Sequence, residues 1–186
     1  MEILKHRVNS FENIDKNFGM EIDIRDHNGE LVLSHDIPDS SSLIKLDDFL
    51  TKIDTNKLLA LNIKSAEIEK NLKKIVSDFN LKNYFTFDWA IPSLIKAQKN
   101  NLICAFRLSE FEKELFPNCS WIWIDSFKEI WYDAKTLTDL KNKGFKLALV
   151  SPELHNRTND LEKFEKIVNT GLADAICTDN PEYWYT

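Results

Sequence analysis

Eight short runs of apolar and β-favouring residues are distributed over the whole chain, and they restrict its fold more than any other feature. Most of these runs are almost continuously apolar, which is typical of strands covered on both faces. Strands of this kind occur in parallel sheets that have helices packed against them. The runs lie at 3–8, 20–25, 58–64, 84–88, 102–107, 121–125, 146–151 and 173–178.

Segments of helical period separate several of these runs. In residues 66–80 the apolar side chains recur at helical spacing and form one stripe, while charged side chains occupy the opposite face. Gly144 and Gly171 fall directly after helical segments, where a left-handed C-cap is expected. The other segments in which this pattern predicts a helix are 91–99, 128–143 and 159–170.

The alternation of strands and helices predicts an α/β fold with a parallel sheet, and eight strands are enough to close a (β/α)8 TIM barrel. Such a barrel usually needs about 250 residues, whereas 186 residues leave only about 23 for each unit. We therefore predict a compact barrel with shortened helices, especially after the first and fifth strands, in a single domain covering 1–186. An open doubly wound sheet is the alternative, but the chain has only four glycines and no Gly-rich βα turn.

Composition excludes some partner classes. The hydrophobic content of 43% is sufficient for one substantial core. The net charge is -6 with the two signs well mixed, which argues against a nucleic-acid partner, because such binding depends on clustered Lys and Arg. No stretch approaches the roughly 20 apolar residues that span a bilayer. The three cysteines lack metal-ligand spacing and indicate reduced thiols, so that a cytoplasmic location is expected.

The second strand-like run carries two acidic side chains in a favourable arrangement. Glu21 and Asp23 are two residues apart, so both carboxylates project from the same face of the strand. Asn28-Gly29 predicts a turn, and the apolar run 31–33 then returns the chain, with His35, to the same end. The sequence therefore predicts a small hairpin excursion after the second strand, with an imidazole delivered beside two carboxylates.

In a barrel of this kind, chemical groups gather at the carboxyl ends of the strands. Polar residues do end every predicted strand, although they were not used to choose the strands. Carboxylates that can hold a divalent cation, histidines that can move protons and an arginine that can bind phosphate together indicate metal-assisted phosphodiester chemistry. These strand-end residues are His6, Arg7, Glu21, Asp23, Asn62, Lys64, Asp88, Arg107, Asp125, Ser151, Glu153, Thr178 and Asp179.

The order of several motifs resembles the N-terminal signature of the glycerophosphodiester phosphodiesterase family. That signature is a His-Arg pair, a Glu-Asn-Thr motif, a Glu-x-Asp pair, and then Asp-Gly and His-Asp. Leu61-Asn-Ile-Lys64 is similar to the family's Glu-x-Lys strand, and the segment 173–181 is similar to its closing motif. The N-terminal matches in this chain are His6-Arg7, Glu12-Asn13, Glu21-Ile-Asp23, Asn28-Gly29 and His35-Asp36.

The resemblance implies a barrel enzyme that binds one divalent cation, Mg²⁺ or Ca²⁺, and cleaves a small phosphodiester. His6 and His35 match the general acid and base of the family, and Arg7 and Lys64 match groups that contact the phosphate. Glu21 and Asp23 match metal ligands, and the third metal-ligand position corresponds to Asn62. The implied function is therefore metal-dependent hydrolysis of a glycerophosphodiester or a related phospho-sugar diester.

Two departures from the family pattern keep an alternative open. Asn62 replaces an anionic ligand by a neutral amide, which weakens the binding of a hard cation. Val8 replaces a glycine and is expected to narrow the approach to the phosphate. The alternative is a catalytically degenerate barrel that binds a phosphorylated ligand without turnover. For an active enzyme, the same residues also allow attack by a substrate hydroxyl, which gives a cyclic phosphate, instead of attack by water.

Further residues are expected near the rim of the barrel. Trp89 directly follows a strand and is a candidate for contact with substrate. Asp125 and Glu153 are rim candidates, and either carboxylate is a potential replacement for the one missing at Asn62. Two interpretations are open for His155: a loop residue that reaches the ligand or, in preference, a surface side chain.

Overall fold

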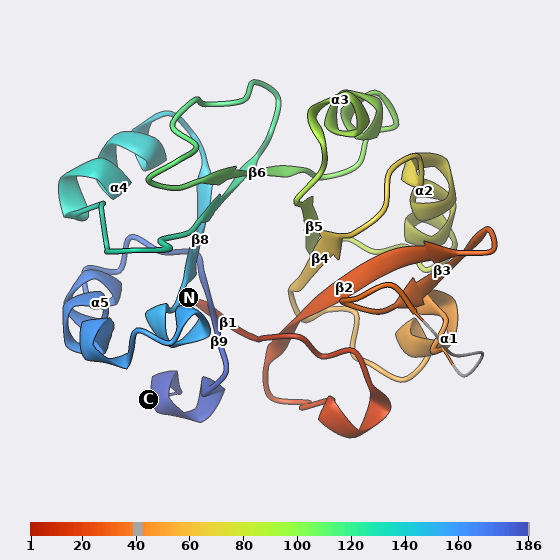
Figure 1. Ribbon diagram of the computed structural model, residues 1–186, viewed down its shortest axis with the longest axis horizontal. Helices are drawn as coiled ribbons and strands as arrows, with labels where there is room; N and C mark the ends of the chain where they lie inside the picture. Colours follow the sequence, from red (N-terminus) through yellow and green to blue (C-terminus); the bar gives the residue numbers. More distant parts are fainter. Residues whose placement is uncertain (39–42, 186) are drawn as a thin grey trace.

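The computed structural model describes residues 1–38 and 43–185 and contains a single nine-stranded sheet. Eight of its strands run parallel, in the order β5-β4-β2-β1-β9-β8-β7-β6 (Figure 1). The strands are β1 Glu2–Lys5, β2 Gly19–His27, β3 Glu30–Leu33, β4 Leu59–Ile63, β5 Tyr84–Phe87, β6 Ala105–Leu108, β7 Trp121–Ile124, β8 Lys146–Val150 and β9 Ala175–Thr178. The helices are α1 Leu46–Leu50, α2 Glu69–Asp78, α3 Ile91–Lys99, α4 Ala134–Asn142 and α5 Leu161–Val168.

The parallel strands curve into a nearly closed barrel. The two ends of the sheet, β5 and β6, are joined through a single bridge between Thr86 and Cys104, where the Thr86 N–H donates to the Ile103 carbonyl at 2.8 Å. This junction, which we call the seam, is the weakest contact between neighbouring strands. The structure confirms the predicted compact (β/α)8 barrel and excludes the open doubly wound sheet.

The hairpin predicted after the second strand is also present. β3 pairs antiparallel with β2, with Ile24 opposite Leu33. The turn between them places Asn28 and Gly29 at φ of 54° and 86°, a left-handed conformation that suits these two residue types. β3 adds no ninth member to the barrel, so this excursion serves to bring His35 back toward the strand ends.

The helices are short, as the length of the chain requires. The connections between β1 and β2 and between β6 and β7 contain no α-helix, and these are the two places where shortening was expected. The helix predicted over 128–143 begins only at Ala134, so that prediction is wrong for its first six residues. Asp133 stops the helix there, because its carboxylate accepts a hydrogen bond from the Thr136 N–H at 2.8 Å as an N-cap.

Large aromatic side chains fill the interior of the barrel. Phe85 stacks on Trp121 with ring centroids 4.6 Å apart, and Phe87 stacks on Trp123 at 4.1 Å. The other strands contribute small residues, three of them paired in register with these aromatic side chains, so the large rings of β5 and β7 fit without widening the barrel. These small interior residues are Ala60, Ala105, Ala148, Ala175 and Cys177.

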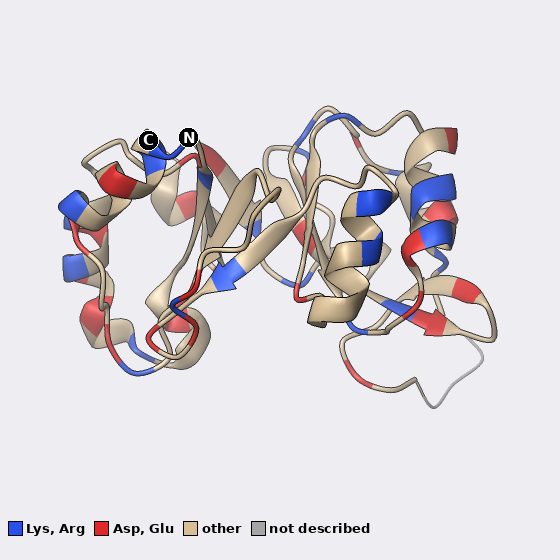
Figure 2. Ribbon diagram, turned by 90° about the horizontal axis from the view of Figure 1, so that it is seen from above, with Lys and Arg blue, Asp and Glu red and all other residues tan. Residues whose placement is uncertain are grey.

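A second, larger apolar cluster lies between the outside of the sheet and the helices. Helices α1 to α3 cover one side of the barrel and α4 and α5 the other (Figure 1). Acidic and basic residues are interspersed along these outer helices (Figure 2). None of the described helices is long and apolar enough to cross a membrane.

Candidate functional site

The functional side chains continue the inward-facing rows of the barrel strands. Because side chains alternate between the two faces of a strand, the inward row of β1 runs from Leu4 to the residue just beyond the strand, His6. The row of β4 runs from Ala60 to Asn62, and that of β6 runs from Ala105 to Arg107. The apolar interior therefore ends in a polar layer at the carboxyl edge of the barrel.

This polar layer surrounds a cavity of about 220 Å³ at the mouth of the barrel. It is lined by three histidines, three cationic side chains and several carboxylate or amide side chains, which come from different strands and the loops that follow them. Residues that line the cavity are His6, Arg7, Glu21, His35, Asn62, Lys64, Asp88, Arg107, Asp125 and His155, above a floor that includes Phe87 and Trp123. The cavity brings together seven of the ten site residues predicted from the sequence.

Glu21 is the most unusual of the acidic groups. Its side chain is almost fully buried, and burial together with the nearby charge of Asp23 raises its pKa from 4.5 to about 7. Its Oε2 accepts a hydrogen bond from the Arg7 N–H at 2.8 Å. Arg7 adopts a φ of 52°, a strained conformation for a residue with a side chain, and it directs this N–H into the site.

Asp23 is buried and is held from several sides. The Asn9 amide donates to its Oδ2 at 2.7 Å, and the Asn9 Oδ1 accepts from the Asp23 N–H at 2.9 Å. Lys64 Nζ lies 3.3 Å from Asp23 Oδ1, and Arg7 Nε lies 3.8 Å from Oδ2. The carboxylate is therefore oriented and has two cationic neighbours within reach of the cavity.

Asn62 provides a test of whether a cation fits here. It pairs in register with Asp23 on the neighbouring strand, and its buried Oδ1 has no hydrogen-bond partner. A buried oxygen without a partner beside two buried carboxylates suits a hard cation, which prefers oxygen ligands. Within the described ranges no three His, Cys, Asp or Glu side chains are grouped to hold a metal ion, so the oxygen set is two carboxylates and one amide.

Each histidine of the cavity is paired with a carboxylate. His6 Nδ1 lies 2.9 Å from Asp179 Oδ1, and its Nε2 lies 4.0 Å from Glu21 Oε2. His35 Nδ1 lies 2.8 Å from the exposed carboxylate of Asp36. A carboxylate that accepts the proton of one ring nitrogen leaves the other nitrogen free as a base, so both rings can serve proton transfer.

A network of four residues forms the opposite wall of the cavity. Arg107 binds Asp88 through two nitrogens, at distances of 2.5 to 3.0 Å, and also pairs with the buried Asp125. His155 Nε2 lies 2.7 Å from Asp125 Oδ1, and Phe127 packs against the His155 ring with centroids 4.9 Å apart. Burial raises the pKa of Asp125, but His155, Arg107 and the Ser126 N–H outweigh it, and the net shift is downward.

Three predicted site residues lie outside the cavity lining. Asp23 is buried beside Lys64, as described above. Trp89 is buried, donates from Nε1 to Thr86 Oγ1 at 2.8 Å, and lines a neighbouring groove instead. Glu153 accepts hydrogen bonds from Ser151 and from Thr178 Oγ1, which engage both of its carboxylate oxygens.

Other expectations need correction. His155 lines the cavity, so the preferred interpretation as a surface side chain is wrong; its place in the loop that follows β8 was the signal that identifies it. Asn9, which orients Asp23, follows the His6-Arg7 pair at the same rim and was also missed. Val8 does not narrow the approach to a phosphate, because its side chain is packed in the outer core. Asp125 is engaged by Arg107 and His155 and does not replace the carboxylate absent at Asn62.

The cysteines take no part in this site. Cys104, Cys119 and Cys177 are free and buried. Burial raises the pKa of Cys104 to about 11 and that of Cys119 to about 12. Both thiols therefore remain protonated at neutral pH and are poor nucleophiles.

Comparison with solved structures confirms the fold that the motif resemblance implied. A glycerophosphodiester phosphodiesterase from Thermotoga maritima aligns with a TM-score of 0.74 at 18% identity, over 98% of this chain and 96% of that one. The enzyme of the same name from Agrobacterium tumefaciens aligns at 0.72 and 16% identity, over 97% and 96% of the two chains. A phosphodiesterase from Oleispira antarctica, in complex with the product sn-glycerol-3-phosphate, aligns at 0.67 and 15% identity, over 98% and 94%.

The sequence comparisons, by contrast, found no match. No protein-family model matches the chain, and no curated protein matches it. The similarity that these comparisons show is therefore one of fold, at a sequence identity of 18% or less in the three structures named above.

Proposed function

We propose that this chain is a metal-dependent phosphodiester hydrolase that acts on a glycerophosphodiester or a related phospho-sugar diester. One observation carries the proposal. His6, His35, Arg7 and Lys64 line a single cavity together with Glu21 and Asn62, and the buried carboxylate of Asp23 lies within 4 Å of Arg7 and Lys64. The fold shared with solved glycerophosphodiester phosphodiesterases supports the same reaction class.

Glu21, Asp23 and Asn62 are the residues that would hold one divalent cation, Mg²⁺ or Ca²⁺. When bound, the cation would offset the negative charge of the phosphate. Arg7 and Lys64 lie beside these ligands and supply two further positive charges for the phosphate oxygens. A diester placed between these groups has its phosphorus within reach of both proposed catalytic histidines.

His6 and His35 carry out the proton transfers in this proposal. One imidazole takes a proton from the attacking water as a new P–O bond forms. The other gives its proton to the alkoxide oxygen as the bond from phosphorus to that oxygen breaks. Asp179 and Asp36 hold the two rings in the orientation that these steps need. The products are a phosphomonoester and an alcohol.

The direct test is the hydrolysis of glycerophosphocholine with Mg²⁺, Ca²⁺ or Mn²⁺ and with EDTA. We expect His6→Ala and His35→Ala each to lower kcat by about a hundredfold or more, because each removes a proton-transfer group. His27→Ala is the matched control, since His27 lies at the hairpin turn and does not line the cavity. Equal product release by all four proteins would contradict the proposal. A cyclic phosphate among the products would identify attack by a substrate hydroxyl.

One observation favours a second function, the binding of a phosphorylated ligand without turnover. Asn62 is neutral, and Lys64 already places a positive charge 3.3 Å from Asp23. For that function, calorimetry with sn-glycerol-3-phosphate gives binding that changes little when EDTA is added. Asn62→Glu then distinguishes the two functions, because an added carboxylate at a true metal position strengthens cation binding.

A further inference from the structure

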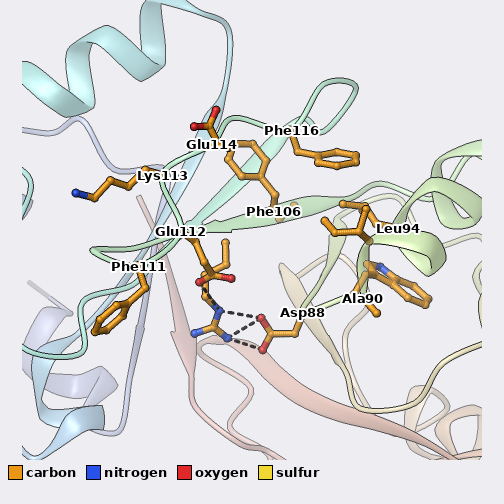
Figure 3. Close-up of a pocket in the computed structure, with 13 residues that line it drawn as sticks. Asp88, Ala90, Leu94, Phe106, Phe111, Glu112, Lys113, Glu114 and Phe116 are labelled. Carbon is orange, nitrogen blue, oxygen red and sulfur yellow. Dashed lines mark hydrogen bonds and ion pairs between the residues drawn. The ribbon is translucent and has the colours of Figure 1, made fainter.

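A second hollow adjoins the catalytic cavity. This apolar groove has a volume of about 650 Å³ and lies beside the seam of the barrel, between the start of α3 and the connection from β6 to β7 (Figure 3). That connection, residues 109–120, contains no helix. Its walls include Trp89, Leu94, Phe106 and Phe116, and Figure 3 shows Phe106 and Phe116 on one side and Leu94 on the other.

The groove and the cavity share part of their walls. Asp88 and Arg107 line both hollows, so the ion pair between them forms their common boundary. A row of aromatic rings follows the same path. Phe111 at the groove packs on Phe127 with centroids 6.1 Å apart, and Phe127 in turn lies against both Arg107 and His155. A molecule bound in the cavity that reaches past the Arg107–Asp88 pair therefore meets the apolar side chains of the groove.

The groove exposes large apolar side chains to solvent. Ile91 is 54% exposed and Phe111 is 61% exposed, although both lie on a protein with a net charge of -6. The charges near them, Glu112, Lys113 and Glu114, give a rim without excess positive charge, which disfavours a second anionic group. An uncharged apolar chain satisfies both conditions.

We propose that the groove binds an apolar chain carried by one alcohol of the phosphodiester, so that the preferred substrates are diesters of glycerol phosphate with a long alkyl or acyl-bearing alcohol. This proposal rests on the proposed function for the position of the phosphate. The phosphate lies in the cavity among Arg7, Lys64 and the histidines, and the chain crosses the Arg107–Asp88 pair to contact Phe111 and Ile91. Small glycerophosphodiesters fill only the cavity and leave the groove to water.

A series of glycerophosphate esters of n-alkyl alcohols tests the proposal. Burial of one methylene contributes about 0.8 kcal/mol, which corresponds to about fourfold in kcat/KM. With partial burial we expect kcat/KM to rise by about a hundredfold or more from the methyl to the octyl ester. Hydrolysis of the whole series at equal kcat/KM would overturn the proposal while leaving the proposed function intact. Failure to hydrolyse any member would contradict the proposed function instead.

A binding measurement decides the matter even without turnover. Calorimetry with octyl phosphate and methyl phosphate, below the micelle concentration, should give a dissociation constant about a hundredfold lower for the octyl compound. Equal affinities would overturn the proposal. So would sedimentation data showing that a second copy of the chain occupies the groove and excludes octyl phosphate.

Matched variants test whether the alkyl chain of the ligand lies in the groove. Ile91→Asp places a charge at the groove, whereas Ile95→Asp makes the same change one turn later on α3, at a 41% exposed residue outside the groove lining. We expect Ile91→Asp and Phe111→Ser to reduce the preference for octyl over methyl phosphate at least about tenfold. Ile95→Asp should keep the wild-type preference. An equal loss in both isoleucine variants would show that the groove is not the binding site.

Discussion

Individual polar residues at the barrel mouth carry the proposed chemistry. Because several of them are buried, replacing one is expected to change the stability of the protein by a measurable amount. Glu21 has almost no contact with solvent, yet it must share a small volume with Asp23. The protein tolerates this arrangement because Arg7, Asn62 and Lys64 surround the two carboxylates with donors and positive charge. The stored repulsion is the physical reason to expect a cation here.

The raised pKa of Glu21 predicts a pH-dependent stability in the absence of divalent cations. The ordinary pKa of this carboxyl group is 4.5, and in the folded protein it is about 7. The protonated group therefore stabilises the folded state fully below pH 4.5, and this contribution is lost as the pH rises through 7. Glu21→Gln removes the ionisation. We expect the variant to exceed wild type by about 3 kcal/mol at pH 8 in urea unfolding, and to match it near pH 4. A difference independent of pH would contradict this account.

Asp125 predicts the opposite pH dependence. Its lowered pKa means that its contribution is present above its ordinary pKa of 3.8 and is lost as the pH falls through the lower, folded value. Asp125→Ala leaves Arg107 and His155 without a buried partner. We expect a loss of about 3 kcal/mol in the free energy of unfolding at pH 7, which decreases as the pH falls below 3.8.

The control for Asp125 is an exposed acidic residue. Asp139 also pairs with a cation, Lys135, at 2.8 Å, but both side chains are largely exposed. Asp139→Ala should leave the urea midpoint at its wild-type value, since solvent screens such a pair. A similar loss in both variants would mean that the burial of Asp125 is not the cause.

At the scale of the elements, strand β2 is the most constrained. It carries Glu21 and Asp23 and pairs with β1, β3 and β4. Its first residue, Gly19, has no room for a side chain, because a Cβ there would lie 2.5 Å from the Leu58 carbonyl oxygen and 2.9 Å from Leu4 Cδ2. The entry of the chain into β2 therefore depends on a close approach of backbones.

Gly19→Ala should displace this strand. We expect the free energy of unfolding to fall by about 3 kcal/mol, because a backbone carbonyl cannot move aside as a flexible side chain can. Cation binding should weaken together with stability, since β2 supplies two of the three proposed ligands. A fully stable Gly19→Ala protein would show that β2 is less tightly held than described.

The sequence predicts elements best where a local pattern and a tertiary role agree. The stripe over 66–80 marks α2, and Asn28-Gly29 marks the hairpin turn, because both signals are local. The helix over 128–143 was predicted too long, since its first part is held by tertiary contacts. Trp131, for example, donates to the Asp125 carbonyl at 2.7 Å.

The same distinction holds for the candidate site. His6, Glu21 and Asn62 could be placed at one rim because strand ends meet there in any parallel barrel. Two other features could not be predicted: the pairing of Asp125 with His155, and the separation of Trp89 from the cavity. Both depend on how loops cross the barrel mouth.

For the molecule as a whole, the seam between β5 and β6 is the weakest boundary of the barrel. One bridge joins these strands, whereas β1 and β2 are each paired in register on both sides. In native-state hydrogen exchange, we expect amides at the facing edges of β5 and β6 to open at lower free energy than those of β1 and β9. Uniform protection around the barrel would contradict this view.

The seam also connects fold and function. The apolar groove lies beside the seam, next to a connection without a helix, and Arg107 lines both the groove and the candidate cavity. In our proposal, the apolar part of the substrate lies beside this helix-free connection.

The most direct measurement of the central claim is a crystal structure with Mn²⁺ and sn-glycerol-3-phosphate, using the anomalous signal of the metal. The account predicts one cation bound by Glu21, Asp23 and the Asn62 Oδ1, with the phosphate contacting Arg7 and Lys64 between His6 and His35. No anomalous peak at these oxygens, together with a phosphate bound elsewhere, would contradict it.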